Sequence, residues 1–140
     1  MSDATMLADA GVEGQLATRA DINKHGGDFR KIVEGVNNCL DAIVIPIEES
    51  SRVISDYAQG NLEIRFGIET HGDFRNLADT LDHLGEELEA ILDDSNAVLD
   101  AIADNDLTRH SSVKGVGEFK NSLTVLKTAV LPLMILFQAF

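Results

Sequence analysis

A glycine, an acid, a phenylalanine and a base follow one another in that order at three places in this 140-residue chain. The glycines are Gly27, Gly72 and Gly117, each 45 residues from the next. A carboxylate and a cation at fixed spacing could serve in acid–base chemistry, which also needs a second titratable group beside them. A histidine precedes the motif in the first two copies, but a valine does so in the third. The pattern therefore does not predict a catalytic residue.

The other residues that could bind a metal are also poorly spaced for that role. His25, His71, His83 and His110 do not have the spacing of metal ligands, and we interpret them as solvated residues. The acid-rich stretches "DDSN" and "DNDLT" lack the distal glutamate of an EF-hand. No phosphate-binding glycine loop and no nucleophile motif is present. We expect a protein that is not an enzyme and has no metal, cofactor or small-molecule substrate.

A local structural role accounts for all four residues of the repeated motif. The glycine ends a connector, where backbone freedom is useful. The acid then caps a helix start, where its carboxylate can accept backbone N–H groups and meets the positive end of the helix dipole. These caps are Asp28, Asp73 and Glu118. The phenylalanine is the first core residue of the helix, and the base points outward.

Apolar residues continue from each phenylalanine in alternating steps of four and three, the pattern of a left-handed coiled coil. The pattern predicts helices over Asp28–Gln59 and Asp73–Asp104, each about 48 Å long, and a third helix that starts at Glu118. The predicted bundle core consists of Phe29, Val36, Leu40, Ile43, Ile47, Ile54, Phe74, Leu81, Leu88, Leu92, Leu99, Phe119 and Leu126.

Two residues interrupt this pattern. Pro46 lies inside the first long helix, where proline bends a helix or marks a junction between two halves. Gly85 lies on the apolar stripe of the second long helix, where it allows a partner helix to approach closely or simply weakens the helix.

The segments 60–72 and 105–117 connect the predicted helices. They are longer than the roughly 2–8 residues that usually join antiparallel helices, and each can extend over about 43 Å. We therefore predict parallel helices joined by a connector that returns along them. The apolar residues expected to anchor the connectors are Leu16 in the first copy, Leu62 and Phe66 in the second, and Leu107 and Val113 in the third.

The repeat divides the chain into three modules of helix, connector and helix, at residues 1–45, 46–90 and 91–135, with an apolar tail at 136–140. The first module has a weak first helix. One apolar stripe on each helix is too little for a stable core in a single chain. A homodimer about a two-fold axis would enclose all the stripes in parallel four-helix bundles, so we expect an all-α fold of such bundles stacked end to end.

Composition narrows the range of partners and compartments. The net charge of −13 argues against nucleic acids and anionic membranes, which need clustered Lys and Arg. The single cysteine, Cys39, suits a reducing cytosol, and we interpret it as a small residue near the core. The N-terminus does not resemble a signal peptide. The apolar stretch from Thr128 is shorter than the roughly 20 residues that cross a bilayer, so we expect no membrane segment.

The second module resembles the HAMP domain of bacterial and archaeal receptors. The shared features are Pro46 near the start of its first helix, Gly60 and Leu62 at the start of the connector, Phe66 as second anchor and Asp73 at the start of the second helix. The third module looks similar, with Ile91, Asn105 and Ser111 at the equivalent positions, so that Val113 would serve as its second anchor. The usual Asp-Glu-apolar-Gly of the family is replaced by Gly-Asp/Glu-Phe-Arg/Lys. The chain therefore resembles a divergent, concatenated HAMP array of a methyl-accepting chemotaxis or sensory receptor.

The resemblance implies a cytoplasmic signal relay that passes a conformational change between input and output domains of a longer dimeric receptor. Its partners would be a second copy of the chain and those adjacent domains. Two alternatives remain open. One is a passive dimerisation rod or spacer with the same fold, and the other is a monomeric α-solenoid scaffold of antiparallel helix pairs, whose repeat length is similar.

Overall fold

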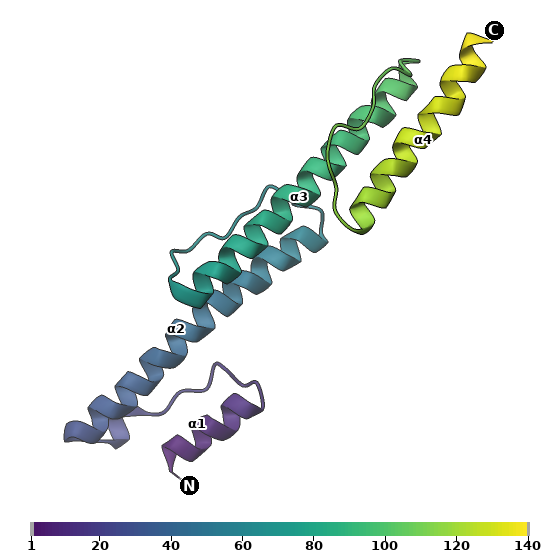
Figure 1. Ribbon diagram of the computed structural model, residues 1–140. Coiled ribbons are helices and arrows are strands. Elements are labelled where there is room, and N and C mark those ends of the chain that lie inside the picture. The colour runs from purple at the N-terminus through teal and green to yellow at the C-terminus, as the bar shows by residue number, and fades with distance from the viewer. Residues whose placement is uncertain (1, 140) are drawn as a thin grey trace. The chain divides into compact units, whose positions relative to one another are not determined.

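The computed structural model describes residues 2–139, a range that is helical with no strand (Figure 1). Its elements are α1 (Asp3–Val12), the 3-10 helix η1 (Ile22–Lys24), α2 (Gly27–Ala58), α3 (Gly72–Ala103) and α4 (Glu118–Gln138). The predicted all-α fold class is confirmed. The two long helices begin and end within one residue of their predicted bounds.

The chain forms two compact units. The first contains the residues up to Ser55 together with Phe66–Asp79, and the second contains Asp56–Arg65 together with the residues from Thr80 onward. Both α2 and α3 begin in the first unit and end in the second, so each long helix contributes to two sets of contacts. This division does not follow the module boundaries at residues 45 and 90, which stay a prediction.

The repeated glycines fix where the helices start. Gly27, Gly72 and Gly117 have φ angles of 58°, 58° and 59°, a left-handed conformation that costs other residues about 1–2 kcal/mol. A Cβ atom at any of the three would meet no other atom within 4 Å. The backbone angle, and not a shortage of space, is therefore what requires glycine at these positions.

The helix ends repeat as well. Gly14, Gly60 and Asn105 follow α1, α2 and α3 with φ angles of 75°, 89° and 61°. The backbone N–H of the next residue donates to a carbonyl five residues earlier in each case, at 2.7, 2.9 and 2.8 Å. This is the Schellman motif, which satisfies the last carbonyls of a helix and turns the chain away from its axis. Asparagine tolerates the left-handed conformation better than most residues, which explains how it replaces glycine in the third copy.

Each connector then runs back along the helix that it leaves. The first connector brings His25 to 2.7 Å from Asp3, at the start of α1. The second begins near Tyr57, and its Gly67 lies 2.6 Å from the Glu49 carboxylate. The third returns from the end of α3 to Asp94, as its path beside α3 in Figure 1 shows.

The helix that follows each connector is parallel to the one before it. In the first unit, Ala42 and Pro46 of α2 line a hollow with Phe74, in the first turn of α3. In the second unit, Tyr57 of α2 contacts Leu81 of α3. The contacts advance in the same direction along both helices, so α2 and α3 are parallel. α3 and α4 also run in the same direction within the second unit (Figure 1).

Small and β-branched residues make up most of the core that one chain encloses. The buried apolar residues are Ala10, Ala20, Val53, Ala78, Leu81, Ile91, Val98, Leu123 and Val130. Val53, Val98 and Val130 are almost fully buried. Such a core brings helices close together but removes little apolar surface from water.

Candidate functional site

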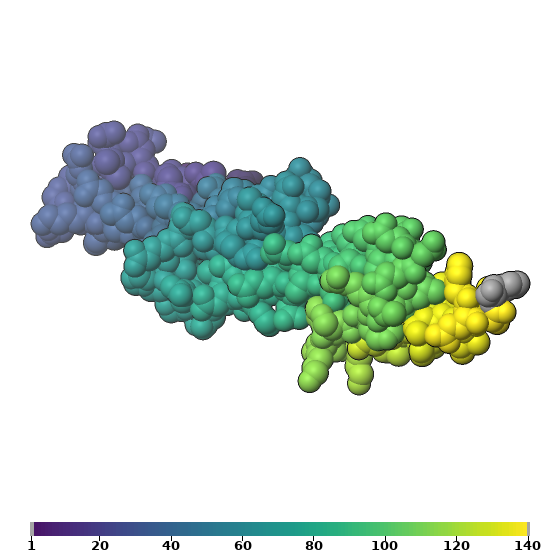
Figure 2. Space-filling view, turned by 90° about the horizontal axis from the view of Figure 1, so that it is seen from above, coloured from purple at the N-terminus to yellow at the C-terminus, as the bar shows by residue number. Residues whose placement is uncertain are grey.

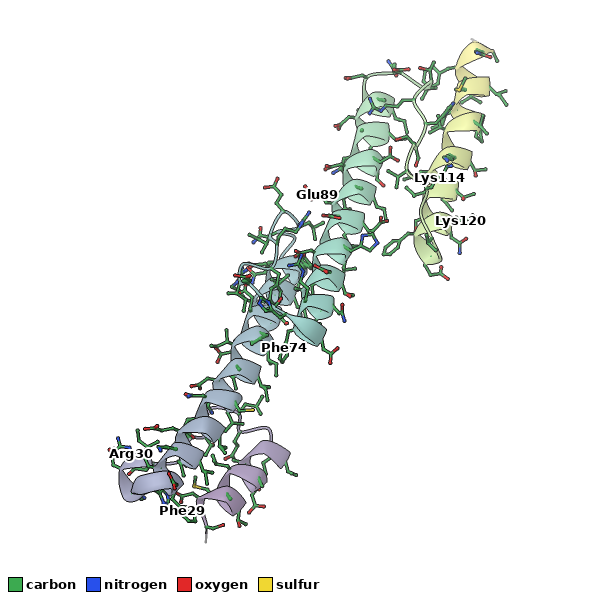
Figure 3. All side chains as sticks on the ribbon, turned by 60° about the vertical axis from the view of Figure 1, so that its left-hand side comes forward. Phe29, Arg30, Phe74, Glu89, Lys114 and Lys120 are labelled. Carbon is green, nitrogen blue, oxygen red and sulfur yellow. The ribbon has the colours of Figure 1, made fainter. Side chains whose placement is uncertain are left out.

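The predicted core positions are divided between two environments in the single chain. Leu81 is buried, and Leu40, Phe74, Leu88 and Leu126 are half-buried. The other predicted core residues are exposed, namely Phe29, Val36, Ile43, Ile47, Ile54, Leu92, Leu99 and Phe119. Phe29 and Phe74 both lie in the first turn of their helices (Figure 3), yet Phe29 is 69% exposed.

Five of these exposed residues form an apolar stripe along α2 and α3, together with Leu77 and Leu84, which were not among the predicted core positions. On α2 it consists of Ile43, Ile47 and Ile54, and on α3 of Leu77, Leu84, Leu92 and Leu99. Consecutive members are four and seven residues apart on α2 and seven, eight and seven residues apart on α3, so those on one helix lie on the same face or next to it. An extended apolar face on a small chain marks an interaction surface. We refer to these seven residues below as the uncovered stripe.

Pro46 is buried inside an α2 that continues through it without interruption. Proline has no N–H, so the Ala42 carbonyl loses its usual helical partner. The Ser50 hydroxyl donates to the Pro46 carbonyl at 2.7 Å, and Ser95, 45 residues later, donates to the Ile91 carbonyl at 2.7 Å. The second and third modules thus share a hydrogen bond from a serine hydroxyl to the carbonyl four residues earlier. The role of Pro46 as a junction stays a prediction.

Gly85 contacts a side chain of its own chain. The Tyr57 hydroxyl can donate to the Leu81 carbonyl at 3.1 Å or to the Ile64 carbonyl at 3.0 Å. A Cβ atom on residue 85 would lie 2.7 Å from the ring carbon that carries this hydroxyl and 3.0 Å from the Arg65 guanidinium. Burial raises the pKa of Tyr57, which keeps the phenol protonated as a donor. The absence of a side chain at Gly85 therefore leaves the room that the Tyr57 ring occupies.

The five residues predicted as connector anchors share one level of burial, and their role as anchors stays a prediction. Leu16, Leu62, Phe66, Leu107 and Val113 are all half-buried. In the third connector, Ser111 occupies the second-anchor position and is only 5% exposed. It is more deeply buried than Val113, the residue that we expected to act as the second anchor there. Ala20, at the equivalent position of the first connector, is also 5% exposed.

An arginine holds each of the first two connectors, a feature that the sequence analysis missed. Arg19 donates to the carbonyls of Leu16 and Thr18, at 2.6 and 2.7 Å, and to the Asp41 carboxylate of α2 at 2.6 Å. Arg65 donates to the carbonyl of Leu62, to that of Ile64 at 2.9 Å, and to the Glu89 carboxylate of α3 at 2.9 Å. Glu89 lies near the middle of α3 (Figure 3).

The two arginine arrangements are alike at the connector, although Glu89 lies three residues beyond the position equivalent to Asp41. In both, the guanidinium binds the carbonyls one and three residues before it and a carboxylate on the following helix. A planar guanidinium with several donors suits this geometry, and a lysine ammonium does not. We call each arrangement a guanidinium staple, because it ties the connector to the helix that follows it.

A carboxylate holds the second and third connectors to the helix that precedes them. The Glu49 carboxylate accepts from the Gly67 N–H at 2.6 Å and from Arg52 at 2.7 Å. The Asp94 carboxylate, 45 residues later, accepts from the Ser112 N–H at 3.0 Å and from the Ser112 hydroxyl at 2.8 Å. We call each arrangement a carboxylate latch.

The latches change the acidity of both carboxyl groups. The Arg52 hydrogen bonds, opposed by burial and aided by the Gly67 N–H, lower the pKa of Glu49 to about 2. Burial alone would raise the pKa of Asp94, but the dipoles of Ser111, Ser112 and the Val113 N–H outweigh it and lower that pKa to about 2. Both latches therefore carry a full negative charge at neutral pH.

Three residues predicted as caps lie in first helical turns. Asp28, Asp73 and Glu118 occupy these positions in α2, α3 and α4. The residue before Glu118, Gly117, makes no side-chain cap. The Asp28 carboxylate lies 3.3 Å from the Lys31 ammonium. A favourable interaction with the helix dipole fits these placements, and the capping hydrogen bonds stay a prediction.

Two smaller interpretations were wrong for the single chain. His25 is not a freely solvated residue, because it is half-buried, lies 2.7 Å from Asp3 and stacks on Phe29. The His25 hydrogen bond lowers the pKa of Asp3. Cys39 was expected near the core but is exposed.

No compact polar site accompanies these contacts. In the range 2–139, no group of three or more His, Cys, Asp and Glu side chains could hold a metal ion. An apolar hollow of about 530 Å³ lies between α1 and the first half of α2, lined by Leu7, Ala20, Val33 and Leu40 among others. This hollow opens onto Phe29 and Val36, which are themselves exposed, so it is a groove on the helix surface.

Of the described residues, only those of α4 form a helix long and apolar enough to cross a membrane. The helix has 21 residues and a mean hydropathy of 1.3, by length and composition only. The sequence-based expectation of no membrane segment counted residues from Thr128, whereas the helix begins at Glu118. The C-terminal end of α4 lies at the molecular surface on the face that Figure 2 shows. A single such helix is weak evidence of a membrane span, because core helices of soluble proteins pass the same test.

The described residues form parallel helices joined by connectors that return along the preceding helix and are held there by hydrogen bonds. Residues 24–90 match the HAMP domain family, a stretch that spans α2, the second connector and part of α3. The predicted resemblance is confirmed at this level. HAMP is a signalling, non-catalytic domain found between the input and output domains of receptors. No curated protein and no solved structure matches the chain.

Proposed function

We propose that this chain is a signal-relay array of three HAMP modules, which passes a conformational change along a dimeric, cytoplasmic part of a sensory receptor of the chemotaxis type. The observation that carries the proposal is the uncovered stripe. It continues along α2 and α3 on the side that the intrachain contacts leave free. A second copy in parallel register would bury it and complete four-helix bundles.

The core has the features of an element with two packings. Ser50 is buried and Ser95 half-buried at equivalent core positions, where a larger apolar side chain would pack more tightly. An interface that is not packed to a single optimum can have two arrangements within a few kcal/mol of each other. Since α2 and α3 each belong to two units, a rotation at one end of either helix would reach the contacts at the other end.

Cysteine cross-linking tests the parallel dimer directly. Cys39 is exposed and is the only cysteine, so in a parallel two-fold dimer each Cys39 lies at the same height as its copy. Mild oxidation of the full chain should give a covalent dimer, and a Cys39→Ser control should give none. Light scattering that finds a stable monomer at micromolar concentration would overturn the dimer.

A receptor chimera separates the relay from the passive rod. Ser50→Ala and Ser95→Ala, placed in a receptor that reports its output, should shift the output at constant expression if the modules switch. Unchanged output in both variants, together with an altered melting temperature, would favour the rod. The α-solenoid alternative does not fit, because it needs antiparallel helix pairs and short turns, whereas α2 and α3 are parallel.

A further inference from the structure

We propose that the third connector, residues 105–117, is the one that opens first, because a single carboxylate makes all of its side-chain hydrogen bonds with the helices in the described residues. The second connector is tied to the preceding helix by the Glu49 latch and to the following helix by the Arg65 staple. In the described chain, the hydrogen bonds from residues 107–117 to helix side chains all end on Asp94. This inference rests on contacts within one chain and does not depend on the proposed relay.

The third copy lacks both partners of the staple. His110 stands at the position of Arg65, 45 residues later, and Met134 stands at the position of Glu89. His110 is exposed, and a neutral or singly charged imidazole cannot bind two carbonyls and a carboxylate together. In the described residues, the side-chain hydrogen bonds of this connector to helices therefore reach α3 and not α4. Its contact with α4 is one of packing, at Gly115 against Leu123 and the start of α4, where Lys114 and Lys120 also lie (Figure 3).

The latch that remains is also incomplete. The second carboxylate oxygen of Asp94, Oδ2, is buried without a hydrogen-bond partner, and so is the hydroxyl of Ser111. That hydroxyl lies close enough to influence the carboxylate but outside hydrogen-bond geometry. Buried polar groups without partners favour exposure to water. Opening the third connector would hydrate both groups, whereas the Glu49 latch also has Arg52 as a partner.

The second and third connectors offer a matched pair of reporters for this inference. The N–H groups of Gly67 and Ser112 stand at equivalent positions, and each donates to the carboxylate of its latch. Their hydrogen exchange, measured by NMR on the full chain and corrected for intrinsic rates, reports the opening of each connector. The N–H of Ser112 should exchange at least about tenfold faster than that of Gly67. The reason is that only the Asp94 latch holds the third connector, whereas the Glu49 latch and the Arg65 staple both hold the second.

A transplanted staple tests the cause. The double variant His110→Arg/Met134→Glu supplies both missing partners and should slow exchange at Ser112 about threefold to tenfold. The single variant His110→Arg lacks the carboxylate and should slow exchange less. Asp94→Asn should speed exchange at Ser112, whereas Asp93→Asn, at the exposed neighbouring residue, should leave it unchanged.

Two results would overturn the inference. One is an equal corrected exchange rate for Gly67 and Ser112 in the unaltered chain. The other is a double variant in which Ser112 exchanges as fast as before, while the helical circular dichroism shows that the chain is folded. If Asp94→Asn fails to fold, the comparison of Gly67 with Ser112 and the double variant still decide the outcome.

Discussion

Replacing Gly85 by alanine should destabilise the protein, although alanine is the better helix former. In an exposed helix interior this exchange gains about 1 kcal/mol. At residue 85 the added Cβ would lie 2.7 Å from the Tyr57 ring and 3.0 Å from the Arg65 guanidinium. Tyr57 must then move and lose its hydrogen bonds to Leu81 and Ile64.

The opposing costs exceed the gain. Overpacking costs about 1–3 kcal/mol, and a lost hydrogen bond that leaves buried groups unpaired costs about 1–3 kcal/mol more. We therefore expect Gly85→Ala to lower the free energy of unfolding by about 1–3 kcal/mol. Urea unfolding followed by circular dichroism measures this change, at one fixed protein concentration because dimerisation would contribute to stability.

Two controls isolate the contact. Gly35 lies inside α2 with nothing within 4 Å of an added Cβ, so Gly35→Ala should stabilise the protein by about 0.5–1 kcal/mol. In a Tyr57→Ala background the obstacle is gone, and Gly85→Ala should become stabilising as well. If Gly85→Ala stabilises the unaltered protein, or destabilises it equally in the Tyr57→Ala background, the steric explanation is wrong.

Three further outcomes follow from the latches and the stripe. Glu49→Gln should lower the free energy of unfolding by about 1–2 kcal/mol at pH 7, while Glu48→Gln at the exposed neighbour should change it by less than about 0.5 kcal/mol. The pKa of Glu49 is lowered from 4.5 to about 2, so its contribution is complete above pH 4.5 and is lost as the pH falls toward 2. That contribution is at most about 3 kcal/mol, and acid titrations of the unaltered protein and the Glu49→Gln variant should converge near pH 2. Leu99→Glu, a charge in the uncovered stripe, should weaken dimerisation in sedimentation by tenfold or more, as about 1.4 kcal/mol of lost burial requires; an unchanged dimer would exclude this face.

The sequence predicted the helices and the direction of the connectors because both depend on local chemistry. A glycine at φ near 58° has few substitutes, so the three motifs mark helix starts with little error. The four-and-three spacing identifies helix faces over more than eight turns, which a strand or loop would not sustain. The length of the connectors then indicates that neighbouring helices are parallel, because each connector is long enough to return along the helix that it leaves.

The contacts that hold the connectors were missed because they join residues far apart in sequence. Glu49 and Gly67 are separated by 18 residues, and Arg65 and Glu89 by 24. The repeat itself contained a signal for them. Glu49 and Asp94 are acids at the 45-residue interval, and Arg19 and Arg65 stand at equivalent positions once the longer first connector is counted. A comparison of the copies that sought charges as well as apolar identities would have found both sets.

Which residues of the apolar face are buried within the chain could not be predicted from the sequence. Periodicity shows that residues such as Val53 and Ile54 are near the apolar face, but it does not show which helix covers each one. In the structure Val53 is fully buried within the chain, while Ile54, the next residue, is 53% exposed. Only the position of a neighbouring helix separates them. A switch that rotates α2 would exchange these two environments, so the boundary between Val53 and Ile54 is where the proposed relay should be most sensitive to substitution.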